Sequence, residues 1–192
     1  MRKVRSILSW AQSHNEQEDM HFPILGMGYG YVSMIRSQMK INNSIRPQMV
    51  SGRKQLNLIH DTNHTYLFDE YSNEKLEDQL DKIKFFSDVE FGVTMEDFII
   101  TEKDLSKIFL PIASFHDDAK NNQNDEIVAA IEGVVYPWFG LSYRLDRIQF
   151  SMEQSKIDQV DHSREAILHA QKIGNLFVDE ARLSSNRYDY VF

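Results

Sequence analysis

The segment Phe22-Pro23-Ile24-Leu25-Gly26-Met27-Gly28-Tyr29-Gly30 decides the fold of this chain. A short apolar run ends in closely spaced glycines, and Val32, Ile35 and Met39 then recur with helical spacing. This order of residues predicts a strand, a tight turn and a helix. The turn is the first candidate for a functional site.

Glycines between a strand and a helix fit two functional turns. A phosphate-binding turn needs the pattern G-x-G-x-x-G, but here the third glycine comes one residue early, and no acidic ribose ligand can be assigned. A nucleophile elbow places its reactive residue in the middle of G-x-Nuc-x-G, and the middle residue here is Gly28, which has no side chain. A turn that merely requires glycine is the third interpretation.

The remaining pattern predicts a layered α/β sheet in one domain, because strand-like and helix-like runs alternate over 192 residues. A polar segment over 117–125 has the composition of a hairpin or loop, and Ser163 is the expected N-cap of a long final helix. Besides the helix after the glycine turn, the expected helices span 4–11, 74–83 and 163–181. The expected strands span 22–25, 108–113, 127–131 and 138–143, with one further short strand among the loops of 42–81.

Composition excludes several classes of function. The 29 acidic and 21 Lys or Arg residues give a net charge of −8, so we expect no nucleic-acid partner. The chain has no cysteine, which removes disulfides, thiolate metal sites and cysteine nucleophiles. No secretory leader pattern is visible, which favours an intracellular location, and no run of about 18 apolar residues predicts insertion into a membrane.

Histidines are the remaining candidates for metal binding. His60 and His64 are spaced for one face of a helix, but the Asp, Thr and Asn between them favour a turn. His116 precedes two aspartates in what reads as a solvated loop, and His162 and His169 are expected on the surface. We therefore predict no metal and no other cofactor.

Three segments, in order, resemble one protein family. Phe22 to Gly30 is similar to the pattern FP-x-x-G-x-C-x-G, and Ile131 to Asp146 (IEGVVYPWFGLSYRLD) is similar to MEG-x-x-YP-x-x-G-x-Q-W-H-P-E. His162 to Arg182 resembles a closing helix that starts with H-S/A-x-x-A-I/V and finishes with EAR. These are patterns of gamma-glutamyl hydrolase (peptidase family C26), within the class I glutamine amidotransferase-like superfamily.

The resemblance implies a mostly parallel sheet flanked by helices, a flavodoxin-like three-layer fold that lacks its first strands. It implies one domain over 1–183, equivalent to about the last two-thirds of a usual family domain, with a tail over 184–192. It also implies that the catalytic positions are altered. The nucleophilic cysteine position is Gly28, the histidine position is Arg144 and the following glutamate position is Asp146.

Glycine supplies no nucleophile, and arginine stays protonated at neutral pH and cannot act as a base. The resemblance therefore predicts a catalytically inactive protein that serves as a structural or scaffolding subunit. A shortened sheet leaves a strand edge, so we expect a protein partner, a homologous subunit or a larger assembly, to cover that edge. Two alternatives stay open: a family member that still binds a glutamyl ligand of the folate polyglutamate type through Arg144, and a partial chain of such an enzyme.

Overall fold

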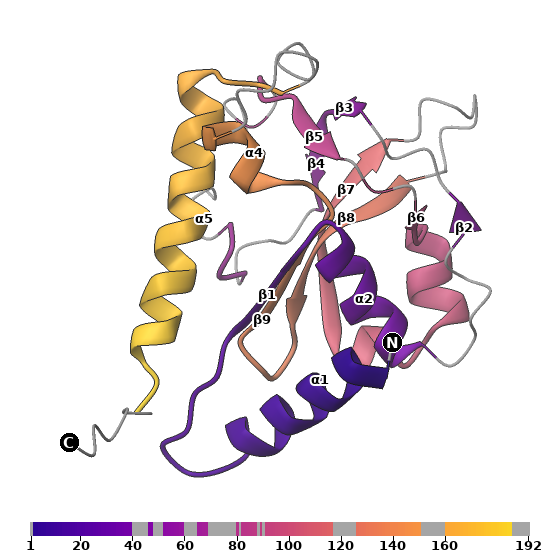
Figure 1. Cartoon of the computed structure of the whole chain (residues 1–192). Helices are drawn as coiled ribbons and strands as arrows, with labels where there is room; N and C mark the ends of the chain where they lie inside the picture. Colours follow the sequence, from indigo (N-terminus) through magenta and orange to yellow (C-terminus); the bar gives the residue numbers. More distant parts are fainter. Residues whose placement is uncertain are drawn as a thin grey trace.

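The computed structural model describes residues 2–39, 46–47, 52–59, 65–68, 80, 82–87, 89, 91–116, 126–150 and 160–185. These residues form a mixed α/β arrangement with a five-stranded sheet between layers of helices (Figure 1). The predicted α/β class is therefore confirmed. The strand order is β1 (Ile24–Met27), β9 (Trp138–Leu141), β8 (Glu126–Gly133), β7 (Phe109–His116) and β4 (Leu56–Leu58).

The strand directions differ from the expected mostly parallel sheet. Among the described strands of this sheet, only β1 and β9 pair in parallel. The β9–β8, β8–β7 and β7–β4 pairs are antiparallel, so that part of the prediction is wrong. A parallel connection needs a crossover of about a dozen residues or more. Only residues 134–137 join β8 to β9, and 117–125 join β7 to β8, so these neighbours form hairpins.

Helices cover both faces of the sheet (Figure 1). On one face lie α1 (Arg2–Asn15) and α2 (Tyr29–Gln38), and on the other lie α4 (Leu145–Phe150) and α5 (Arg164–Arg182). The hydroxyl of Ser163 accepts a hydrogen bond from the amide of Ala166 at 3.2 Å, which confirms the predicted N-cap. Among the described residues, no helix has the length and apolarity that crossing a bilayer requires.

Smaller elements complete the described part of the chain. Two short antiparallel pairs lie outside the main sheet: β2 (Arg46–Pro47) with β6 (Phe91–Gly92), and β3 (Gly52–Lys54) with β5 (Phe85–Ser87). A π-helix, η3 (Asp97–Thr101), and a 3₁₀ helix, η4 (Leu105–Lys107), precede β7. The helix expected near 74–83 falls mostly outside the described residues, as does most of the 184–192 tail.

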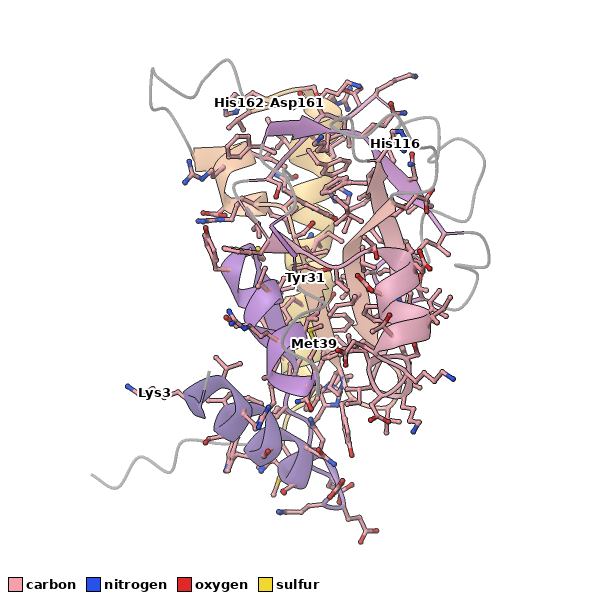
Figure 2. The ribbon with its side chains drawn as sticks, turned by 90° about the vertical axis from the view of Figure 1, so that its right-hand side faces the viewer. Lys3, Tyr31, Met39, His116, Asp161 and His162 are labelled. Atoms are coloured by element: carbon pink, nitrogen blue, oxygen red, sulfur yellow. The ribbon has the colours of Figure 1, made fainter. Side chains whose placement is uncertain are left out.

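Two apolar clusters hold the layers together, one on each face of the sheet. The strands contribute to both, because successive side chains of a strand point to opposite faces. On β8, Ile127 and Ala129 belong to the cluster under α5, whereas Val128 and Ile131 belong to the cluster under α2. Figure 2 shows Tyr31 of α2 in the middle of the molecule, where its buried hydroxyl donates to the carbonyl oxygen of Val128 at 2.6 Å. This bond joins α2 to the centre of the sheet.

Candidate functional site

The glycine turn lies where β1 ends and α2 begins. Gly28 has φ 55° and ψ −117°, a backbone conformation that residues with a Cβ rarely adopt. Its amide donates to the carbonyl oxygen of Leu141 on β9 at 2.8 Å, and its carbonyl accepts from the amide of Val32 at 3.2 Å. The predicted strand, turn and helix are thus confirmed, with Gly28 at the sharpest point.

The three glycines of the turn have different roles. A Cβ on Gly26 would overlap Met34 Sδ and lie 3.0 Å from the backbone of Gly30 and Tyr31, so Gly26 allows α2 to pack closely on β1. Gly28 is required by its backbone angles. A Cβ on Gly30 would meet no atom within 4 Å, so neither packing nor backbone angle requires glycine there.

Arg144 and Asp146 lie at the same edge of the sheet as the turn, because the parallel pairing of β1 with β9 places Gly28 beside Leu141. Arg144 Nε donates to Asp146 Oδ1 at 2.8 Å, and Arg144 Nη2 donates to Asp146 Oδ2 at 2.6 Å. This two-point ion pair holds the pKa of Asp146 below its usual range. The structure therefore places the three positions named by the resemblance at one edge of the sheet, where Asp146 pairs with Arg144.

Ser142 is a polar residue at this edge that the sequence analysis missed. It is 2% exposed, and its Oγ has no hydrogen-bond partner among the described residues. Its backbone is firmly held, because its amide donates to the carbonyl of Ala129 at 2.8 Å and its carbonyl accepts from Ser87 Oγ at 3.0 Å. A buried hydroxyl without a partner is uncommon in folded proteins. The available signal was its place at the Gln position of the family pattern quoted above, two residues before Arg144.

The prediction that His169 lies on the surface is wrong. Its side chain is buried and its Nε2 lies 3.3 Å from the hydroxyl of Tyr143, with the ring of Phe85 packed edge-on against it. Burial lowers the pKa of His169 to about 3, so the ring is neutral at physiological pH. The signal was present in the sequence, because His169 shares the spacing of Ala166, Ala170 and Ile173, which form the buried face of α5.

The other histidines give a mixed outcome. His162 is half-buried, with Nδ1 2.7 Å from the carbonyl oxygen of Ile148, and it lies with Asp161 at the end of the molecule away from Lys3 (Figure 2). His116 is exposed at the end of β7, but the aspartates after it, and the His60–His64 segment, lie outside the described residues. Within the part of the chain that the structure describes, no three His, Asp or Glu side chains are grouped to hold a metal.

A second candidate site lies at the opposite end of the β1–β9 pair. There a cavity of about 460 Å³ is bordered by the 134–137 turn, the segment before β1 and the end of α5. Glu132, at the end of β8, is 5% exposed and lines this cavity, as do His21 and Glu180. The sequence analysis gave none of them a role. The detectable signal was a lone carboxylate at the end of the apolar run 127–131.

Comparison with known proteins finds likenesses among solved structures. No protein-family model matches the chain, and no curated protein matches it. Among solved structures, the chain is similar to a Thermoplasma acidophilum protein provisionally named as a GMP synthase subunit, with a TM-score of 0.48 and 14% sequence identity. The alignment covers 95% of this chain and 67% of that chain.

Proposed function

We propose that this chain is a non-hydrolytic, glutamine amidotransferase-like domain of the gamma-glutamyl hydrolase type, which acts as a structural component of a protein assembly. The single observation that carries the proposal is Gly28. It has the backbone angles of a sharp strand-to-helix elbow but presents no side chain. A nucleophile at the apex of such a turn is what acyl-transfer chemistry on this framework needs.

The surroundings of Gly28 support the same proposal. Covalent catalysis needs a base that can accept a proton from the nucleophile. Arg144 stands where the resemblance places the histidine that would act as this base. Its guanidinium remains protonated and is already paired with Asp146. The polar side chain that remains, Ser142 Oγ, has no partner among the described residues to act as its base.

The side of β1 that faces away from β9 supports a role in assembly. Among the described residues, β1 pairs on one side only, with β9. The amides of Ile24 and Gly28 donate toward β9, so alternation directs the backbone groups of Leu25 and Met27 to the open side. Unpaired strand edges recruit other strands, so we propose that a strand of a separate polypeptide pairs there.

Hydrogen exchange tests this proposal directly. The tagged chain is recovered with its stoichiometric partner, and amide exchange is compared for the complex and the isolated chain. We expect new protection at Leu25 and Met27, with Ile24 and Gly28, which already donate to β9, as internal controls. A partner that leaves the Leu25 and Met27 amides unprotected would contradict edge pairing. Strong protection of those amides in the isolated chain would mean that the chain covers its own edge.

An assay of hydrolysis tests the loss of chemistry separately. We expect no turnover of gamma-glutamyl-p-nitroanilide above the buffer rate, for the chain alone or in its complex. Turnover that co-purifies with the chain and disappears in Arg144→Ala would overturn the proposal. Activity that persists unchanged in Arg144→Ala would point to a contaminating enzyme, and it would be removed by further purification.

A second candidate function is binding of a glutamyl ligand without cleavage. The observation that favours it is Arg144, whose side chain is 30% exposed and lies at the edge where Ser142 Oγ lacks a partner among the described residues. A ligand carboxylate could share the guanidinium with Asp146. Isothermal titration with a gamma-glutamyl dipeptide separates the two functions, because a purely structural protein gives no binding heat and Arg144→Ala then changes nothing.

A further inference from the structure

The cavity bordered by the 134–137 turn and the glycine turn lie at opposite ends of the β1–β9 pair. Gly28 follows the carboxyl end of β1, whereas Pro137 precedes the amino end of β9, and the amide of Ile24 donates to the carbonyl of Pro137 at 3.0 Å. In Figure 1 the β8–β9 turn, the end of α5 and the chain between α1 and β1 meet at one end of the molecule. The cavity is therefore separate from the proposed elbow site.

The lining of this cavity combines apolar walls with carboxylates. Val134, Val135, Tyr136 and Phe139 line it with apolar and aromatic side chains, and its volume of about 460 Å³ suits a small organic molecule. Its acidic groups are Glu16, Glu132 and Glu180. No lysine or arginine is among the described residues that line it, so the only cationic candidate on its described wall is His21.

The carboxylates are held in place by neighbouring groups. Both oxygens of Glu132 accept from the amide of Tyr66, at 2.9 and 3.1 Å. Glu180 lies 2.9 Å from His21 Nε2, and Glu16 accepts from the hydroxyl of Tyr136 at 2.7 Å. The cavity therefore has a preformed, negatively charged wall with a nearly buried carboxylate in it, Glu132.

We propose that this cavity binds a small organic cation, with an ammonium group beside Glu132 and an apolar stem against Val134, Tyr136 and Phe139. An ammonium supplies the donors that carboxylate oxygens accept, and aromatic faces attract cations. An anionic ligand would meet the three acidic groups without a compensating lysine or arginine among the described wall residues. This site is independent of the proposed function of the glycine turn.

The protonation of Glu132 supports this proposal. Burial raises the pKa of Glu132 to about 7, and repulsion from Glu180 on α5 adds to the rise, while the backbone amides of Tyr66 and Leu67 oppose it. His21 and Glu16 face the same cavity. A bound ammonium favours the ionised carboxylate, so binding near neutral pH releases a proton from Glu132.

Isothermal titration with phenethylammonium tests the proposal, with 3-phenylpropionate as an anion of similar shape. We expect phenethylammonium to bind and 3-phenylpropionate not to bind. Titration at pH 6.5 in two buffers of different ionisation enthalpy should show release of a proton on binding. Glu132→Gln keeps the shape and an acceptor for Tyr66 but removes the charge, so we expect the affinity to fall by about tenfold or more.

Two further variants make the result decisive. Glu126→Gln makes the same change at the other end of β8, where Glu126 accepts from Ser114 Oγ at 3.2 Å, and it should bind as the parent does. Val135 lines the cavity but is 75% exposed, so Val135→Lys adds a competing cation without disturbing the core and should weaken binding several-fold even if Glu132→Gln fails to fold. The proposal is overturned if phenethylammonium gives no heat at millimolar concentration or if 3-phenylpropionate binds with equal affinity. It is also overturned if Val135→Lys leaves the affinity for phenethylammonium unchanged.

Discussion

Alanine substitutions in the glycine turn should have three different effects on stability. At Gly28, φ 55° and ψ −117° strain any residue with a Cβ. At Gly26, the new Cβ overlaps Met34 Sδ and approaches the backbone of α2. At Gly30, which lies in the first turn of α2, the new Cβ enters open space. The same chemical change therefore probes backbone strain, packing and helix propensity in turn.

The magnitudes follow from these causes. Backbone strain at Gly28→Ala should lower the free energy of unfolding by about 1–3 kcal/mol. Overpacking at Gly26→Ala should lower it by about 1–3 kcal/mol as well, and removal of the Met34 side chain should relieve part of that cost. Gly30→Ala should raise it by up to about 1 kcal/mol, because alanine favours a helix over glycine. Gly174→Ala on α5 should also raise it, since its Cβ meets nothing within 4 Å.

Urea unfolding followed by circular dichroism measures all four variants under one set of conditions. In a protein of this size, 1 kcal/mol corresponds to about 2–4 °C in Tm, so thermal melting provides an independent check. The double variant of Gly26→Ala with Met34→Ala should show coupling, and that of Gly28→Ala with Met34→Ala should be closer to additive. The reasoning is refuted if Gly28→Ala is as stable as the parent, or if Gly30→Ala is as destabilised as Gly28→Ala.

Three further predictions concern ionisable groups. In the unfolded chain a histidine gains a proton below about pH 6.5, whereas buried His169 does so only near pH 3. The free energy of unfolding should therefore fall as the pH is lowered across that window. His169→Phe should remove this slope in urea titrations. The pKa of Glu132 is raised from 4.5 to about 7, so this side chain contributes stability below pH 4.5 that is lost as the pH rises through 7. The loss is about 2 kcal/mol after solvent screening. Glu132→Gln should flatten this change. Arg144→Ala should raise the pKa of Asp146, which an NMR titration of its carboxyl group measures. It should lower the free energy of unfolding by less than about 1 kcal/mol at neutral pH, since the pair is partly exposed. An unchanged titration would mean that another group holds Asp146 ionised.

Much of the fold was predictable from local pattern. The apolar run before Gly26, the cap at Ser163 and the strand-like runs around Ile112 and Val128 each depend on nearby residues, and each formed the expected element. Strand direction depends instead on the length of connections and on pairing between distant segments. The 134–137 connection is short enough that β8 and β9 form a hairpin, whereas the resemblance led to the expectation of a mostly parallel sheet.

The candidate sites were less predictable for the same reason. Gly28, Arg144 and Asp146 were found because they lie within recognisable segments, and the structure brings them to one edge. The cavity joins Glu132 to residues far away in the sequence, such as His21 and Glu180. His21 lies in the segment between α1 and β1, Glu180 lies on α5, and the two are 159 positions apart in the chain, so no local spacing connects them.

The backbone of the glycine turn explains why its residue type is informative. A nucleophile placed at these angles costs about 1–3 kcal/mol of strain, and an enzyme keeps that cost because the strained residue presents the reacting atom. Glycine adopts the same angles without the strain, so Gly28 allows the path of the chain from β1 into α2 while it presents no side chain. The contacts that define the path, from the Gly28 amide to Leu141 and from Val32 to the Gly28 carbonyl, involve backbone atoms alone. The turn can therefore keep its shape without a reactive side chain, which is why the proposed function places the role of the chain in the edge of β1 and not in hydrolysis.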